Sequence, residues 1–182
     1  MRAMSKPLIL LIGTSGCGKS TICNHLMRKY GYTQVKSYTT RPPRDNDADL
    51  LTHTFITQAE VAQYGDDIVA DCWFNGNYYF ATKHQVDAAD LYVVDRKGLI
   101  DLYKNYFGRN VIAVYIDVPL EIVAQRMEQR GDDNDTIMAR LQHDAEAFAD
   151  TKDLCDFVCD NSTQSKLADI VEFIHGLIEY AR

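Results

Sequence analysis

A glycine-rich loop directly after a short apolar run constrains this chain more than any other feature. Residues 13–20 read Gly-Thr-Ser-Gly-Cys-Gly-Lys-Ser and follow the apolar residues 8–12, which matches the pattern G-x-x-x-x-G-K-[ST] between a strand and a helix. The glycines let backbone N–H groups face phosphate oxygens, Lys19 reaches the β and γ phosphates, and Ser20 can ligate Mg²⁺. A helix that starts near Gly18 points its positive end at the same anion. The residues expected to bind the phosphates of ATP or GTP are Gly13, Thr14, Ser15, Gly16, Cys17, Gly18, Lys19, Ser20 and Thr21.

Composition and charge narrow the classes of protein to which this chain can belong. The 182 residues are 46% hydrophobic, which suits one domain with a buried core. The formal charge of −7 disfavours sequence-independent binding to nucleic acid. No apolar stretch approaches the roughly 20 residues that span a bilayer, so we expect no membrane partner and a cytoplasmic location. Five cysteines without a C-x-x-C pair predict reduced thiols, most of them in the core.

Strands that alternate with helices predict an α/β fold with a parallel sheet. We expect strands at residues 8–12, 91–94, 111–117 and near 157–159, and helices at 21–30, 99–106, 119–130, one ending at 148, and 165–180. A short strand is expected before Lys36. Residues 37–90 predict a small mixed insertion: an ordered polar loop over 37–51, a strand over 52–56, a short helix opened by the capping box at 57–60, and a hairpin around Asn75-Gly76. The polar residues 131–135 separate two helices and predict a hinge.

A second group of residues has the chemistry of an oxyanion site. Residues 37–44 read Ser-Tyr-Thr-Thr-Arg-Pro-Pro-Arg, so Arg41 and Arg44 lie three residues apart in a segment stiffened by two prolines. The planar guanidinium group pairs bidentately with phosphate, and proline lowers the entropy lost when a loop closes. The alternative is a solvated basic turn. In a chain that already carries a phosphate loop, we favour a second phosphate site.

The same string resembles the acceptor loop of guanylate kinases, Ser-x-Thr-Thr-Arg-x-Pro-Arg. The resemblance covers nearly the whole chain and continues through Thr54-Phe55, residues 74–79, Asp95 with Gly98, Arg126-x-x-x-Arg130-Gly131 and Arg140-Leu141. It implies a P-loop kinase with a parallel-sheet core (residues 1–36, 91–125 and 142–182), a mixed α/β insertion that binds a nucleoside monophosphate (37–90) and a helical lid (126–141). It also implies ATP and Mg²⁺, with small-molecule nucleotides as partners and GMP or dGMP as the acceptor.

The resemblance also assigns roles to individual residues. It implies catalytic roles for Lys19, Arg41, Arg130, Arg140 and Asp95, and acceptor binding by Ser37, Arg41, Arg44 and Tyr79. It implies that Arg126 and Arg130 belong to the lid, and that Asn161 lies near the adenine. It also implies that Ser20 contacts the metal directly and that Asp95 contacts it through water. Residue chemistry agrees, because phosphoryl transfer depends on in-line positioning and on positive charge over the transferring group. Taken alone, Arg126 and Arg130 would more often form a solvated helix face, and Asp95 could simply cap the next helix.

The positions that read guanine depart from the family pattern. Ala70 stands where a Glu is usual, Ala81 where a small hydroxyl residue is usual, and Val93 where an Asp is usual; His53 replaces a tyrosine of the acceptor-phosphate site but can still donate a hydrogen bond. A site that hydrogen-bonds a base edge discriminates strongly, so apolar substitutes remove both attraction and selectivity. Asp71 and Thr82 each lie one residue away, and a β-bulge could bring a carboxylate and a hydroxyl back into the site. We therefore include His53 and Asp71 among the expected acceptor-binding residues.

Three functions are compatible with these observations. The first is transfer of the γ-phosphoryl group of ATP to GMP or dGMP. The second keeps the kinase chemistry but changes the acceptor to another nucleoside monophosphate or to a ribose bisphosphate, which some relatives phosphorylate. The third is a catalytically silent guanylate-kinase-like module that binds protein partners. The third predicts erosion of the phosphate loop and of the lid arginines, whereas Lys19, Ser20, Arg130 and Arg140 are all present, which favours the two enzymatic functions.

Overall fold

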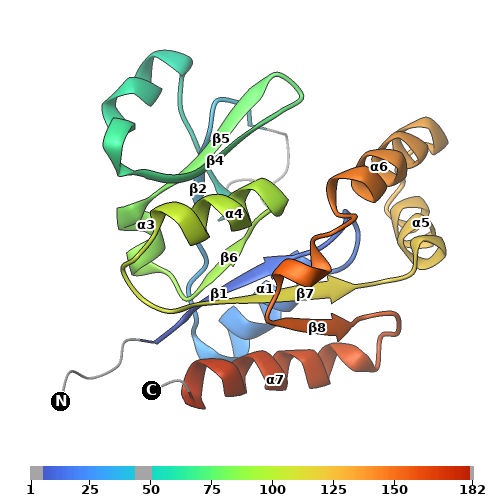
Figure 1. Ribbon diagram of the computed structural model, residues 1–182. Helices are drawn as coiled ribbons and strands as arrows, with labels where there is room; N and C mark the ends of the chain where they lie inside the picture. The colour runs from blue at the N-terminus through green and yellow to red at the C-terminus, as the bar shows by residue number, and fades with distance from the viewer. Residues whose placement is uncertain (1–5, 44–50, 181–182) are drawn as a thin grey trace.

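A parallel four-stranded sheet forms the centre of the structure, a computed structural model that describes residues 6–43 and 51–180 (Figure 1). Its strand order is β6-β1-β7-β8, and the strands are β1 (Leu8–Ile12), β6 (Leu91–Val93), β7 (Val111–Asp117) and β8 (Phe157–Asp160). Neighbouring strands run parallel, as the alternation of strands and helices predicted. Every residue of β1 is buried, which explains why this strand reads as an unbroken apolar run.

Two hydrophobic clusters lie on opposite faces of this sheet. Because side chains alternate along a strand, β1 sends Ile9 and Leu11 into one cluster and Leu8, Leu10 and Ile12 into the other. The first cluster contains helices α1 (Lys19–Tyr30), α5 (Leu120–Gln129) and α7 (Lys166–Tyr180). The second contains α3 (Lys83–Ala88) and α4 (Arg96–Asn105). Helices therefore cover both faces of the sheet, and the carboxyl ends of its strands remain available for a site.

Local signals fix the ends of the helices near the site. Gly31 adopts a left-handed conformation after α1, and its N–H donates to Met27 O, as a helix C-terminus requires. Asp95 precedes α4 and accepts a hydrogen bond from Gly98 N at 2.7 Å. Asp133 precedes α6 (Asn134–Ala147) and accepts from Thr136 N at 2.9 Å. The expected break between α5 and α6 is therefore confirmed, although α6 already begins at Asn134.

A second sheet forms the expected insertion. Its order is β3-β2-β5-β4, with β2 (Ser37–Thr39), β3 (His53–Phe55), β4 (Ile68–Phe74) and β5 (Asn77–Thr82). The 3₁₀ helix η1 (Gln58–Asp67) begins at the capping box of Thr57 and Glu60. Another 3₁₀ helix, η2 (Lys152–Leu154), lies in the core before β8. The prediction of a loop from residue 37 was wrong at its start, because residues 37–39 pair with both β3 and β5. The short strand expected before Lys36 is reduced to one bridge, between Gln34 and Leu91.

The hairpin formed by β4 and β5 has a tight turn and a β-bulge. Asn75 and Gly76 both have positive φ, 48° and 73°, which suits a tight turn between right-twisted strands. The pairing of β4 with β5 shifts register between Ile68 and Ala70, so the proposed bulge is present. In Figure 1 this sheet lies above the parallel sheet at the left, whereas α5 and α6 lie at the right, beyond the connection between β1 and α1. Within residues 6–43 and 51–180, no helix has the length and apolar character that a membrane crossing requires.

Candidate active site

The phosphate loop holds its lysine close to its own backbone. Lys19 Nζ donates to Gly13 O at 2.7 Å and to Thr14 O at 2.8 Å. The loop itself is packed from both sides: a Cβ atom added at Gly13 would lie 2.5 Å from Ile116 O, and one at Gly18 would lie 2.5 Å from Asn161 Nδ2. Both glycines also have positive φ, so a side chain at either position would clash and strain the backbone. Glycine is therefore needed at these two positions, where the phosphate loop packs against β7 and against the C-terminal loop, which follows β8 and contains Asn161.

Two cavities meet at Lys19. One, which we call the insertion cavity, has a volume of about 330 Å³ and lies between the phosphate loop and the second sheet; its walls include Lys19, Ser37, Ala70, Tyr79, Asp95 and Asp144. The other, the α5 cavity, has a volume of about 360 Å³ and is bounded by Gly18, Lys19, Ser20, Arg126, Arg130 and Asn161. Lys19 lines both cavities. Ligands bound in the two cavities would therefore both lie next to Lys19.

Three adjacent strands of the second sheet gather a polar cluster at the insertion cavity. Ser37 on β2 lies opposite His53 on β3, with Ser37 Oγ 3.0 Å from His53 Nδ1. Tyr79 on β5 packs edge-on against His53, and its hydroxyl accepts a hydrogen bond from Arg41 Nε at 3.1 Å. The Arg41 guanidinium also lies 5.5 Å from the centre of the Phe55 ring. The structure thus brings four of the expected acceptor-phosphate residues together, whereas Arg44 lies outside the described residues.

Arg130 and Arg140, the two arginines near α5 and α6 that were expected to be catalytic, share one carboxylate. Arg130 Nη2 and Arg140 Nη1 lie 3.1 and 3.2 Å from Asp132 Oδ2, which links the end of α5 to α6. Arg126 instead donates to two backbone carbonyls, Asn161 O at 2.7 Å and Cys17 O at 3.5 Å. Arg126 therefore ties the C-terminal loop to the phosphate loop, and Arg130 lines the α5 cavity beside it.

Comparisons with known proteins agree with this arrangement. A family model described as an AAA domain matches residues 9–148. A guanylate kinase from Gloeobacter violaceus is 30% identical over 182 residues, which cover 94% of this chain and 86% of the relative. The chain belongs to the guanylate kinase family. A guanylate kinase from Desulfitobacterium hafniense is 31% identical over 74% of the chain and 72% of its own length.

Two further matches concern the fold of this chain and the range of acceptors named for its relatives. The crystal structure of a guanylate kinase from Anaplasma phagocytophilum aligns over 96% of this chain and 88% of its own with a TM-score of 0.68 at 20% identity, so it supports the fold alone. A ribose 1,5-bisphosphate phosphokinase from Enterobacter lignolyticus is 30% identical over 94% of the chain and 92% of its own length. A guanylate kinase and a ribose 1,5-bisphosphate phosphokinase are therefore equally similar to this chain, at 30% identity each.

The positions that read guanine in the guanylate kinase family are apolar in the structure as well. Ala70 and Val93 line the insertion cavity, and Ala81 is fully buried beside Ala70 in the core. Thr82 does not compensate, since its hydroxyl accepts a hydrogen bond from Gln85 N at the start of α3. Of the two residues expected to compensate, only Asp71 lines the insertion cavity, and its side chain alternates with those of Ala70 and Cys72 along β4.

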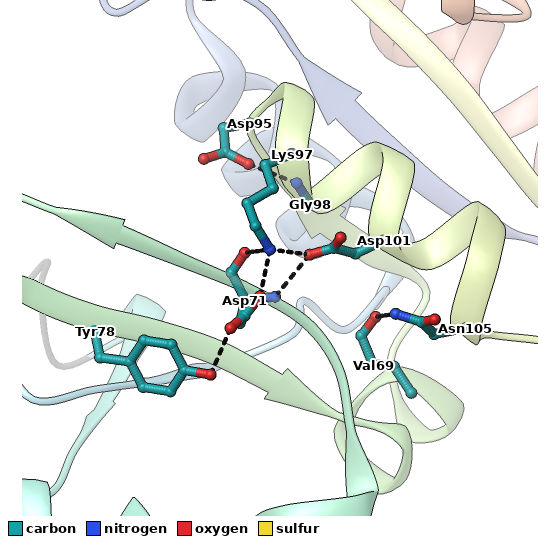
Figure 2. Close-up of polar contacts among 8 residues, drawn as sticks. All are labelled: Val69, Asp71, Tyr78, Asp95, Lys97, Gly98, Asp101 and Asn105. Atoms are coloured by element: carbon teal, nitrogen blue, oxygen red, sulfur yellow. Dashed lines mark hydrogen bonds and ion pairs between the residues drawn. The ribbon is translucent and has the colours of Figure 1, made fainter.

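Asp71 is already bound by other side chains (Figure 2). Lys97 Nζ donates to its carboxylate, and Tyr78 Oη donates to its other oxygen at 2.6 Å. Burial opposes ionisation of Asp71, but these hydrogen bonds outweigh it and hold the pKa of Asp71 below its usual value. Desolvation and the carboxylate raise the pKa of Tyr78. Asp71 is therefore an ionised group with two partners, at the edge of a cavity whose neighbouring walls are apolar.

Asp95 combines a structural and an electrostatic role. Its carboxylate caps α4 through Gly98 N, as the alternative interpretation of the sequence expected, and the same residue lines the insertion cavity. Burial and the neighbouring Asp95 raise the pKa of the Cys72 thiol to about 12, so Cys72 is a neutral wall residue. The capping role does not exclude a role near substrate, because only one carboxylate oxygen is needed for the cap.

A carboxylate that sequence reasoning missed contacts the phosphate loop. Asp144 on α6 is buried, and its Oδ2 accepts a hydrogen bond from Ser15 N at 2.6 Å. The preceding residue, His143, lies with its Nδ1 3.2 Å from Asp144 Oδ1 and packs edge-on against Phe74 of β4. Both residues line the insertion cavity. The sequence around Asp144 carries no local signal for this contact, which depends on tertiary packing of α6 against the phosphate loop.

The donors available for a metal ion are few but suitable. Among the described residues, no group of three or more His, Cys, Asp or Glu side chains is placed to hold a metal. Mg²⁺ in nucleotide sites takes one or two protein oxygens and completes its shell with phosphate and water. Ser20 lines the α5 cavity beside Lys19, and Asp95 lines the insertion cavity. This oxygen set fits a magnesium–nucleotide complex.

Proposed function

We propose that this protein transfers the γ-phosphoryl group of ATP to a nucleoside monophosphate, with GMP and dGMP as the first candidates. The observation that carries the proposal is that Lys19 lines two cavities of similar volume, one against the phosphate loop and α5 and one against the insertion. Two phosphate-bearing molecules bound in these cavities would present their phosphates to the same ammonium group. Such positioning, together with positive charge over the transferring group, supplies most of the rate in phosphoryl transfer.

The donor side of the mechanism uses the loop and the lid. Residues 13–21 bind the triphosphate through backbone N–H groups, and Lys19 exchanges its bonds to Gly13 O and Thr14 O for phosphate oxygens. Arg130 and Arg140 turn from Asp132 to the transferring phosphoryl group as the lid closes. This exchange keeps each cation paired before and after substrate binds, so no unpaired charge is buried. The proposal divides the chain into a core (1–36, 91–125, 142–182), an acceptor insertion (37–90) and a lid (126–141).

The acceptor side uses the cluster on the second sheet. Ser37, His53, Tyr79 and Arg41 present donors toward the acceptor phosphate, and Arg44 is proposed to join them. Arg41 keeps its plane fixed by the Tyr79 hydroxyl and by the Phe55 ring, which lowers the rotamer entropy lost when it pairs with phosphate. Mg²⁺, when bound with ATP, neutralises phosphate charge; Ser20 would hold it directly and Asp95 through water. The proposed substrates are intracellular metabolites, so the proposal includes a cytoplasmic location.

The test is turnover of ATP with Mg²⁺ against separate acceptors: GMP, dGMP, IMP, AMP, CMP, UMP, dTMP and ribose 1,5-bisphosphate. The proposal expects ADP formation that depends on the added acceptor, with GMP or dGMP among the best substrates. Acceptor-independent release of phosphate, or no turnover with any acceptor, would contradict it.

A second candidate acceptor is favoured by one observation. The cavity walls at Ala70 and Val93 offer no hydrogen bond to a base edge, and a relative of equal identity is a ribose 1,5-bisphosphate phosphokinase. A phosphorylated acceptor without a base needs the phosphate cluster but not the base readers. Selective turnover of ribose 1,5-bisphosphate in the same panel would establish this alternative.

A further inference from the structure

Helix α4 closes the free edge of the insertion sheet with side chains. Strand β4 lies at the end of the strand order β3-β2-β5-β4, so alternate N–H and C=O groups of β4 point away from β5 and need partners. Lys97 donates to Asp71 O at 2.9 Å, Asp101 accepts from Asp71 N at 3.3 Å, and Asn105 donates to Val69 O at 3.4 Å (Figure 2). These side chains take the place of a neighbouring strand.

The spacing of these three residues explains how one helix can do this. Lys97, Asp101 and Asn105 are four residues apart and therefore share one face of α4. The opposite face of α4 buries Leu99 and Leu102 in the core. One face of the helix is thus anchored to the parallel sheet while the other holds the edge of the insertion sheet.

The strongest part of this ladder lies at the insertion cavity. Lys97 contacts the carbonyl and the carboxylate of Asp71 and also Asp101 Oδ2 at 2.6 Å. The residues next to Asp71 on β4, Ala70 and Cys72, form one wall of the cavity, and Asp95 and Gly98 beside Lys97 form part of another. One ammonium group therefore connects two walls of the cavity.

We propose that Lys97 is a positioning residue for the phosphoryl acceptor, because it clamps strand β4 to helix α4 and so sets the width of the insertion cavity. The inference rests on the proposed function for the identity of the ligand, but the clamp itself is a property of the structure. Without Lys97, Asp71 and Asp101 would face each other as like charges, which would push the walls apart and add negative charge beside an anionic acceptor. Lys97 itself contacts neither the phosphate loop nor the α5 cavity, so the donor site is spared.

The test is Lys97→Met, which keeps the length of the side chain and removes the charge. We expect the KM for the acceptor to rise by about tenfold or more, with the KM for ATP within about twofold of the unaltered protein. Lys97→Arg restores a cation and is expected to return the acceptor KM to within about threefold. The matched control is Lys29→Met, since Lys29 also joins two elements through Glu172 at similar exposure, 58% against 55% for Lys97, and lines neither cavity.

Three results would overturn the proposal: an acceptor KM within about twofold of the unaltered protein in Lys97→Met, an equal rise in the KM values of acceptor and ATP, or the same change in Lys29→Met. Amide hydrogen exchange supplies a readout that does not need turnover. The Asp71 amide is expected to exchange faster in Lys97→Met than in Lys29→Met, and equal exchange would exclude the clamp. If the unaltered protein turns over no acceptor while Asp71 loses protection in Lys97→Met, the proposed function fails and the clamp stands.

Discussion

At the scale of single residues, the acceptor site is decided by which walls can form hydrogen bonds. Ala70 is buried on β4 and faces the insertion cavity, in the position where the guanylate kinase family usually has a glutamate. A carboxylate there would accept hydrogen bonds from the N–H groups of a guanine edge. The methyl group of alanine forms no hydrogen bond and so does not select one base over another. The cluster of Ser37, His53 and Tyr79 does not depend on that choice, so the proposed function treats phosphate binding and base selection as separable.

Ala70→Glu is therefore expected to create selectivity for guanine. The ratio of kcat/KM for GMP to that for IMP should rise by about tenfold or more, because IMP lacks the exocyclic amino group that a carboxylate would bind and leaves the new group unpaired. Ala70→Gln is the matched control, with the same volume and no charge, and is expected to change the ratio less. Steady-state kinetics with both acceptors measures the effect; an unchanged ratio in Ala70→Glu would show that the base lies elsewhere.

The chemistry-bearing residues differ in how far the sequence could predict them. The loop residues were predictable because strand, glycines, lysine and serine are contiguous, and Ser37, Arg41 and Tyr79 followed from a resemblance. The partners of Asp71 could not be predicted, because Lys97 and Asp101 lie 26 and 30 residues away along the chain and meet it only through tertiary packing. Asp144 was missed for the same reason, since its contact with Ser15 spans 129 residues.

At the scale of secondary-structure elements, helix α6 places a carboxylate against the loop that the proposed function assigns to the phosphates of ATP. The Asp144 carboxylate accepts from Ser15 N, and a phosphate in the loop needs backbone N–H groups of the same set. Two anions cannot share one N–H group at hydrogen-bond distance without strong repulsion. Binding of ATP should therefore require α6 to release Ser15, which couples the position of α6 to the phosphate loop.

Asp144→Ala is expected to bind ATP more tightly, with a Kd lowered by roughly threefold to tenfold, because the competing carboxylate is gone while the loop is intact. Isothermal titration calorimetry with ATP and Mg²⁺ measures this directly. The control is Asp150→Ala, an exposed carboxylate just beyond the same helix, which should leave the Kd unchanged. Weaker binding in Asp144→Ala would mean that Asp144 supports the loop rather than competing with the nucleotide.

Elements with strong local signals were predicted well, and elements that depend on distant partners were not. The expected helices and the four core strands are present, because apolar periodicity and caps such as Asp95 and Gly31 are local. Strand β2 was expected to be loop, since its three residues carry no pattern of their own and become a strand only by pairing with β3 and β5. The short helix α3 was not predicted either; its start at Thr82 follows directly on β5, so no loop separates the two patterns.

At the scale of the whole molecule, the ionised carboxylates that join elements make stability depend on pH. The pKa of Asp71 is lowered in the fold despite partial burial, because Lys97 and Tyr78 bond to it. A carboxyl group whose pKa is lower in the folded protein than in the unfolded chain stabilises the fold above the unfolded-chain pKa, which is about 4 for Asp. That stabilisation is lost as the pH falls toward the pKa of the group in the folded protein. The core and the insertion, which Asp71 and Lys97 join, should therefore separate more easily in acid.

Asp71→Asn tests this linkage. The variant should be less stable than the unaltered protein at pH 7, and the difference should shrink between about pH 4 and pH 3, because the variant has no carboxylate to protonate at this site. Urea unfolding followed through Trp73, the single tryptophan and a neighbour of Asp71 on β4, gives the midpoints. Asp150→Asn serves as the exposed control. A difference that stays constant with pH would contradict the linkage.

The central claim is that Lys19 joins two substrate cavities, and transfer of a labelled γ-phosphoryl group from ATP to GMP tests it most directly. The unaltered protein and Lys19→Ala are compared with Mg²⁺, and circular dichroism confirms that both are folded. The account predicts that label moves from ATP to GDP with the unaltered protein and that transfer falls by about a thousandfold or more in Lys19→Ala. Equal transfer by the two proteins, or label that appears as inorganic phosphate alone, would contradict the account.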